Sequence, residues 1–221
     1  MIGKHLLKDF MNRYRHAWVL LYGAIYMPWF MYLERRTIPE QDYWIISSPL
    51  DQYIPFCEIF IIPYLLWFAF VAIGVAYFFF TSRREFYQVM GFLIIGMTIF
   101  LLISTFIPNG LNLRPEEFPR ENFFTNLLKS SIYDNDTSTN VFPSIHAFNS
   151  LGISIAVFHS DALKKKTFIQ IATHVTTILI LISTVCLKQH SILDVFAALL
   201  LSAIIHPFIY GIYKKKIKTT G

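Results

Sequence analysis

Six long apolar segments constrain what this chain can fold into. A helix needs about 20 apolar residues to cross the hydrocarbon core of a bilayer, and no segment shows the alternating pattern of a strand. Only 15% of the 221 residues are charged and 55% are hydrophobic, whereas a soluble domain carries about 25% charged residues. We therefore predict an integral membrane protein of the all-α class, with one domain over residues 1–221 and six transmembrane helices. The helices are expected at roughly 16–33, 54–80, 86–107, 142–160, 167–187 and 191–212.

The distribution of Lys and Arg predicts the orientation of this bundle, because cytoplasmic segments of membrane proteins are enriched in these residues. With the N-terminus inside, inner segments hold 13 of the 19 Lys and Arg residues and outer segments hold six. The inner set is Lys4, Lys8, Arg13, Arg15, Arg83, Arg84, Lys164, Lys165, Lys166, Lys214, Lys215, Lys216 and Lys218. We therefore expect both termini in the cytoplasm. No small-residue cleavage site follows the first segment, so we expect it to stay as an uncleaved span.

Three short polar blocks lie at the edges of the apolar segments, and the predicted orientation brings all three to the outer face. Ionisable residues are costly near a bilayer, so they mark candidate functional sites there. The blocks are Leu113-Arg114-Pro115, Phe142-Pro143-Ser144-Ile145-His146 and His190-Ser191-Ile192-Leu193-Asp194.

The third block places His190 and Asp194 four residues apart, and hence on one face of a helix. Asp194 can accept a hydrogen bond from one ring nitrogen of His190 and leave the other nitrogen free to attack a substrate. The same pair could instead be a structural contact that joins two helices. The sequence leaves both interpretations open.

The second block is typical of a helix start. Proline is favoured in the first turn of a helix, and the free N–H groups of that turn bind anions. Ser144 adds a hydroxyl donor, and His146 could donate a proton to a leaving oxygen. In the first block, the Arg114 guanidinium suits a phosphate. Each of these two blocks also has a structural interpretation. The second could be an ordinary capped helix, and Arg114 in the first could be an interfacial arginine that extends its charged group toward water.

Together the blocks resemble the three motifs of the type 2 phosphatidate phosphatase superfamily, the lipid phosphate phosphatases. Those motifs are Lys, six residues, then Arg-Pro; Pro-Ser-Gly-His; and Ser-Arg, five residues, His, three residues, Asp. The resemblance covers about residues 105–205 and implies that Arg114 and Ser144 bind phosphate. It also implies that His190 becomes a phosphohistidine, that His146 is the general acid and that Asp194 orients His190.

Three positions depart from those motifs. Ile107 stands where the family has Lys, Ile145 where it has Gly, and Thr184 where it has Arg. Two of the cations that hold phosphate in the family are therefore absent from their usual positions. Lys188 could supply one of them from a different position, or it could be an ordinary interfacial lysine at the end of the fifth span.

By this resemblance we expect a metal-independent phosphatase, without a cofactor, at the extracytoplasmic face of a bacterial plasma membrane. It would hydrolyse a lipid phosphate or diphosphate, and phosphatidate, phosphatidylglycerol phosphate and polyprenyl diphosphate are candidate substrates. The lipid and the bilayer are the expected partners. The net charge of +5 is concentrated beside the apolar segments, where it anchors the chain, so we do not expect nucleic-acid binding. The oligomeric state is left open.

Three alternatives remain. The pattern of two histidines and one aspartate is also similar to that of sphingomyelin synthases and inositol phosphorylceramide synthases, which pass a phosphoryl headgroup to a lipid alcohol. The missing cations at positions 107 and 184 would suit a non-catalytic lipid-binding or transport protein. His146, His190 and Asp194 are also metal ligands by residue type.

Overall fold

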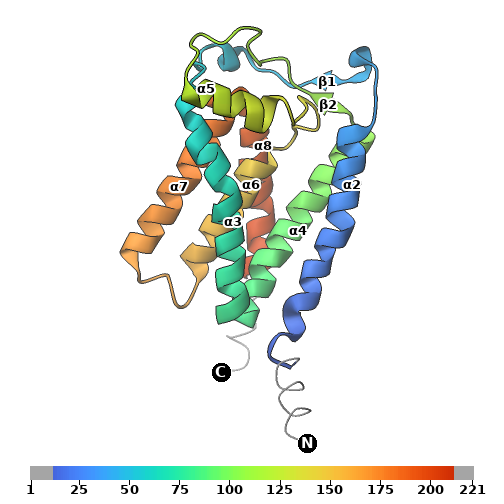
Figure 1. Cartoon of the computed structure of the whole chain (residues 1–221). Coiled ribbons are helices and arrows are strands. Elements are labelled where there is room, and N and C mark those ends of the chain that lie inside the picture. Colours follow the sequence, from blue (N-terminus) through green and yellow to red (C-terminus); the bar gives the residue numbers. More distant parts are fainter. Residues whose placement is uncertain (1–11, 212–221) are drawn as a thin grey trace, which may run out of the picture.

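The chain folds into a helical bundle that is covered at one end by loops and a short helix (Figure 1). The structure is a computed structural model that describes residues 12–211, apart from the side chain of Glu40. The predicted placements of both termini, of Lys4 and Lys8 and of Lys214 to Lys218 lie outside this range. In chain order the helical elements are η1 (Arg15–Tyr22), α2 (Gly23–Arg35), η2 (Glu40–Asp42), η3 (Pro49–Gln52), η4 (Glu58–Phe60), α3 (Ile61–Thr81), α4 (Arg83–Phe106), α5 (Phe123–Leu128), η5 (Lys129–Tyr133), α6 (Ile145–His159), α7 (Thr167–Cys186), α8 (Ile192–His206) and η6 (Pro207–Gly211).

Within residues 12–211, four helical stretches are long and apolar enough to cross a membrane, and they indicate a membrane protein. Large apolar side chains on them, such as Ile73, Phe168 and Phe196, are between 63% and 83% exposed, which is the surface that lipid would cover. The other two predicted spans correspond to shorter elements, η1 with α2 for 16–33 and α6 for 142–160. The four stretches are Glu58–Thr81, Arg83–Phe106, Thr167–Cys186 and Ile192–Gly211.

The central helix of the bundle is α6, which packs against α3, α4, α7 and α8. Its 15 residues give about 22 Å of helix. Two glycines allow α4 and α6 to approach closely. A Cβ atom on Gly96 of α4 would lie 2.0 Å from Phe148, and one on Gly152 of α6 would lie 2.8 Å from Leu93. This packing fixes the position of α6, and with it the second polar block.

Ser144, rather than Pro143, begins the helix of the second block. Ser144 is the N-cap of α6, and its Oγ accepts a hydrogen bond from the N–H of Ala147 at 3.3 Å. The prediction that Pro143 lies in the first helical turn is therefore wrong, and the Phe142–Pro143 peptide bond is cis. The physical reason is that a serine side chain satisfies a free N–H group at a helix start, which makes serine a preferred N-cap residue.

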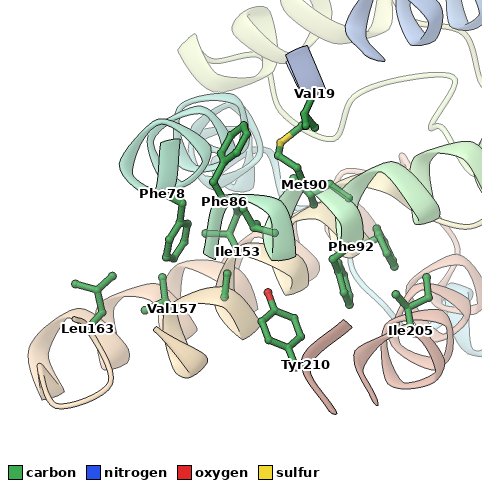
Figure 2. Close-up of a cluster of buried hydrophobic side chains, with 14 of the residues drawn as sticks. Val19, Phe78, Phe86, Met90, Phe92, Ile153, Val157, Leu163, Ile205 and Tyr210 are labelled. Atoms are coloured by element: carbon green, nitrogen blue, oxygen red, sulfur yellow. The ribbon is translucent and has the colours of Figure 1, made fainter. Parts of the chain in front are cut away.

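A large apolar core lies inside the bundle (Figure 2). Its side chains come from η1, α3, α4, α6, the α6–α7 loop, α8 and η6, so they hold all these elements together. The residues labelled in the close-up are Val19, Phe78, Phe86, Met90, Phe92, Ile153, Val157, Leu163, Ile205 and Tyr210.

Loops and α5 cover the other end of the bundle (Figure 1). There β1 (Trp44–Ile45) pairs in parallel with β2 (Asn109–Gly110), a two-residue strand pair that the sequence did not predict. Asn109 is buried, and its Oδ1 accepts hydrogen bonds from the N–H groups of Val141 at 2.8 Å and Phe142 at 2.9 Å. This asparagine therefore attaches the second polar block to the end of α4.

Candidate active site

His146, His190 and Asp194 meet between the N-terminal ends of α6 and α8. His190 Nδ1 lies 3.3 Å from Asp194 Oδ2, and His190 Nε2 lies 3.5 Å from His146 Nδ1. His190 is 6% exposed and Asp194 is fully buried. The three side chains form a line in which each ring nitrogen of His190 faces one partner.

The local sequence at the start of α8 fixes the carboxylate of Asp194. Ser191 is the N-cap and Asp194 is the third helical residue, and the N–H of Ser191 donates to Asp194 Oδ2 at 2.8 Å. Such a capping box satisfies free N–H groups at a helix start. Because the same carboxylate oxygen faces His190, the cap also orients the histidine that precedes the helix.

A second buried carboxylate, which the sequence did not predict, supports the same helix end. Asp51 is 2% exposed, and it accepts hydrogen bonds from Ser191 Oγ at 2.6 Å and from the N–H of Ile192 at 2.8 Å. It also forms a capping box with Ser48 at the start of η3. The spacing Ser48-x-x-Asp51 is that of a capping box, so this pattern could have identified Asp51 as an ordered residue.

Two aromatic rings of α3 hold the ring of His146. The ring of Tyr64 stacks on it with centroids 4.7 Å apart, and the ring of Trp67 contacts it at 4.2 Å. Tyr64 and Trp67 are three residues apart on the helix, so they share one face. These contacts restrict the His146 ring to the orientation in which Nδ1 faces His190.

Arg114 lies beside this line of side chains, held by the loop that follows η5. Its guanidinium donates hydrogen bonds to the carbonyl oxygens of Asp136 at 2.9 Å and Thr137 at 3.2 Å. It also donates to Gln189 Oε1 at 3.0 Å. Since Gln189 directly precedes His190, this bond links Arg114 to the third polar block.

The structure gives the two other predicted phosphate ligands hydrogen bonds within the protein. Ser144 is fully buried, and its hydroxyl caps its own helix. The Lys188 ammonium donates to the carbonyl oxygens of Asp51 at 2.7 Å and Ile54 at 2.6 Å. Buried carbonyl groups require donors, and Lys188 supplies them here. The geometry therefore does not support the prediction that Lys188 replaces a missing phosphate cation.

The two positions that lack the family's cations differ in burial. Thr184 is fully buried near the end of α7, and its carbonyl oxygen accepts from the N–H groups of Gln189 at 3.0 Å and His190 at 3.1 Å. Ile107 is the residue that follows α4 and is 48% exposed. Of the predicted cations, Arg114 is the one that bonds the side chain of Gln189, the residue before His190.

A narrow cavity of about 40 Å³ is lined by both histidines. Two carboxylates, Glu34 at the end of α2 and Asp136, line it as well. Burial raises the pKa of Asp136 to about 6, and Glu34 adds to this rise while Arg114 opposes it. Nothing local in the sequence marks this acidic lining, because Glu34 directly follows the first apolar segment and Asp136 lies in a polar loop. The two histidines that line this cavity are 3.5 Å apart, so their side chains must separate before a phosphate can lie between them.

The line of side chains does not suit a metal ion. Each ring nitrogen of His190 faces a different partner, so the nitrogen of His146 and the carboxylate of Asp194 cannot converge with it on one ion. Within residues 12–211, no group of three or more His, Cys, Asp or Glu side chains could hold a metal ion. The geometry therefore does not support the alternative of a metal site.

Comparison with known families gives one match. A family model described as the PAP2 superfamily matches residues 112–218, a stretch that contains all three polar blocks. No curated protein and no solved structure significantly matches the chain.

Proposed function

We propose that this member of the PAP2 superfamily, which the family model matches over residues 112–218, transfers a phosphoryl group from a membrane lipid phosphate to water. The superfamily comprises phosphatases and related enzymes. The observation that carries the proposal is the line of Asp194, His190 and His146. In this line His190 is the nucleophile, Asp194 orients it, and His146 is the acid on the other side of His190. Asp194 and His190 are 3.3 Å apart and the two histidines are 3.5 Å apart, so a phosphate that separates the histidines would contact both the nucleophile and the acid.

His190 Nε2 is the proposed nucleophile. Its lone pair forms a P–N bond while the bond between phosphorus and the lipid oxygen breaks, which leaves a phosphohistidine. Asp194 accepts the hydrogen bond of Nδ1–H, so it keeps the proton on that nitrogen and stabilises the charge on the ring. His146 donates a proton to the leaving lipid oxygen. It then accepts a proton from the water that breaks the P–N bond and releases phosphate.

Arg114 is the proposed phosphate ligand. Its Nε–H is buried without a hydrogen-bond partner, so the guanidinium keeps a donor for a phosphate oxygen. Its bonds to the carbonyl oxygens of Asp136 and Thr137 can be exchanged for stronger, charge-assisted bonds to phosphate. These bonds would stabilise the charge that spreads over the phosphate oxygens in the transition state.

We also propose six membrane spans with the active site on the extracytoplasmic side. The elements η1 and α2 run without a break from Arg15 to Arg35 beside α4 (Figure 1), and four helices enclose α6. The α3–α4 turn and the α6–α7 loop lie at the end of the bundle opposite α5 (Figure 1). Arg83 and Arg84 begin α4 at this end, and Lys164 to Lys166 lie in the α6–α7 loop. Such an excess of Lys and Arg is typical of the cytoplasmic side of a membrane protein.

The test is turnover by the full chain purified in detergent, with phosphatidate as substrate and a strong chelator present. We expect release of inorganic phosphate by the wild type, and a loss of at least about 10³-fold in His190→Ala because the nucleophile is absent. A phosphoenzyme that forms in the wild type and is absent in His190→Ala would support the covalent step. Added diacylglycerol, used as a lipid alcohol whose acyl chains differ from those of the phosphatidate, separates the two possible acceptors. Transfer to it without release of phosphate would make the protein a phosphotransferase, and equal behaviour of wild type and variant would indicate a non-catalytic protein.

A further inference from the structure

The chain has two cysteines, Cys57 and Cys186, and the fold brings them together. Cys57 directly precedes η4, and Cys186 is the last residue of α7. The N–H of Cys57 donates a hydrogen bond to the carbonyl oxygen of Cys186 at 3.1 Å. This contact joins two segments that are far apart in the sequence, and the first of them lies outside the residues that the family model matches.

The backbone contact meets the main geometric requirement of a disulfide. Two cysteines can be bridged when their Cα atoms lie within about 7 Å of each other. Only short covalent bonds separate the hydrogen-bonded N and O atoms from the two Cα atoms, so this contact keeps the Cα atoms less than about 7 Å apart. The side chains are neighbours as well, because the Cys57 thiol acts electrostatically on that of Cys186.

The two thiols differ in accessibility, which suits a stepwise oxidation. Both are free thiols in the structure, and Cys57 is half-buried, whereas Cys186 is only 7% exposed. An oxidant can therefore reach Cys57 before Cys186. Redox-active cysteines are typically accessible to solvent and lie next to a second cysteine that resolves the first product.

The position of the pair in the bundle also favours oxidation. The η4 turn contacts α5 and α7, so the pair lies at the α5 end (Figure 1), which we propose to be extracytoplasmic. Disulfides form and persist in the bacterial periplasm and are rare in the cytosol. The chain has no third cysteine with which either thiol could pair incorrectly.

We propose that Cys57 and Cys186 form a disulfide with each other, which joins the segment before α3 to the end of α7. The oxidant is a disulfide of the class carried by periplasmic thiol–disulfide oxidoreductases. The Cys57 thiolate attacks this disulfide, forms a mixed disulfide and releases one thiol. The Cys186 thiolate then displaces the second thiol. One disulfide is formed, one is reduced, and the two protons of the cysteines end on the released thiols.

The link would lie next to the candidate active site. Lys188 follows Cys186 by two residues and donates to carbonyl oxygens of the segment that contains Asp51. Asp51 in turn accepts hydrogen bonds from the first residues of α8, directly after His190. Hydrogen bonds therefore join the same two segments, and a disulfide would keep them together when those bonds break.

The first measurement counts the free thiols of the protein in the cell. Bacterial cells that express the full chain are lysed under denaturing conditions with N-ethylmaleimide, which blocks free thiols, and the mass of the purified protein is determined. We expect no maleimide on the wild type, and two on a sample that was reduced before blocking. A non-reduced digest should contain the peptides of Cys57 and Cys186 joined to each other. Cys57→Ala and Cys186→Ala should each bind one maleimide.

Thermal unfolding in detergent measures what the link contributes to stability. Reduction is expected to lower the melting temperature of the wild type by about 5 °C or more, because a disulfide that closes a long loop restricts the unfolded chain. The matched control is the double variant with Cys57→Ala and Cys186→Ala. Its melting temperature should not change when the reductant is added.

Three results would overturn this inference. They are two maleimides on the wild type taken from cells, a disulfide that joins two copies of the chain, and an equal response of wild type and double variant to the reductant. The inference depends on the proposed orientation, and it does not depend on the proposed chemistry. Release of phosphate is measured separately, so a failure here leaves the proposed enzymatic activity unchanged.

Discussion

Two buried carboxylates, Asp51 and Asp194, bind the first residues of α8. Each accepts a backbone N–H at 2.8 Å, from Ile192 and Ser191 respectively. The N-terminus of a helix is its positive end and favours negative charge. At the scale of single residues, the site therefore depends on how one helix start holds the carboxylate that faces His190.

Lys188→Met tests whether this lysine binds phosphate or supports the chain. Because its ammonium donates to two carbonyl oxygens, we expect the variant to lose about 1.5–3 kcal/mol of stability. The KM for a lipid phosphate should stay within about twofold of the wild-type value if Lys188 makes no contact with the substrate. Thermal unfolding in detergent and steady-state kinetics give the two quantities, with the exposed Lys129→Met as control. A tenfold rise in KM without loss of stability would show that Lys188 binds the phosphate of the substrate.

Asp136→Asn tests the acidic lining of the narrow cavity. The pKa of Asp136 is raised from 3.8 to about 6, so its protonated form stabilises the fold at low pH and this stabilisation is lost as the pH rises through 6. The asparagine variant should therefore be more stable than the wild type at pH 7–8, by up to about 3 kcal/mol. The difference should shrink between pH 6 and pH 4. The measurement is the melting temperature of both proteins across this pH range. An equal response of the two proteins to pH would contradict a raised pKa of Asp136.

At the scale of elements, α6 carries His146 and His190 lies just before α8, so the separation of these helix starts sets the distance between the reacting groups. The α6 helix is held against α4 where Phe148 stacks on Phe92, with ring centroids 4.8 Å apart and planes at 10°. Phe148 also lies over Gly96, where no side chain of α4 intervenes. Since Phe148 follows His146 by two residues, this contact positions the candidate acid.

Gly96→Ala should displace α6 and with it His146. The added Cβ would lie 2.0 Å from Phe148 Cε1, and overpacking of this kind destabilises a core by about 1–3 kcal/mol. We expect a lower melting temperature and a lower kcat, because the two histidines would no longer be aligned. Gly23→Ala is the matched control, since a Cβ there meets nothing within 4 Å. Equal effects of the two substitutions would show that the α4–α6 contact does not position the site.

At the scale of the whole molecule, the site and the basic connections lie at opposite ends of the bundle (Figure 1). The loops over the site join α2 to the chain that leads into α6. Asn140 Nδ2 donates to Glu34 Oε1 at 2.8 Å, and Thr137 Oγ1 donates to Glu34 Oε2 at 2.7 Å. The N-terminal part of the chain, which the family match does not cover, therefore closes one side of the site.

Cysteine labelling tests the proposed orientation. In a variant with Cys57 and Cys186 replaced by serine, Lys129→Cys at the start of η5 should react with a membrane-impermeant maleimide in intact cells. Lys165→Cys in the α6–α7 loop should react only after the cells are permeabilised, because the bilayer separates the two faces. Both lysines are exposed on the protein surface. The reverse pattern would invert the orientation, and reaction of both sites in intact cells would contradict a bundle that crosses the membrane.

The sequence by itself determined the helical class, four of the apolar stretches and the residues of the three polar blocks. These features depend on local spacing, since hydrophobic length and an interval of four residues follow from helix geometry alone. Only the tertiary structure decided that Lys188 binds the carbonyl groups of Asp51 and Ile54, and that Glu34 and Asp136 line the cavity with His190. Such contacts join residues far apart in the chain. They depend on how the helices pack, and no local pattern records that packing.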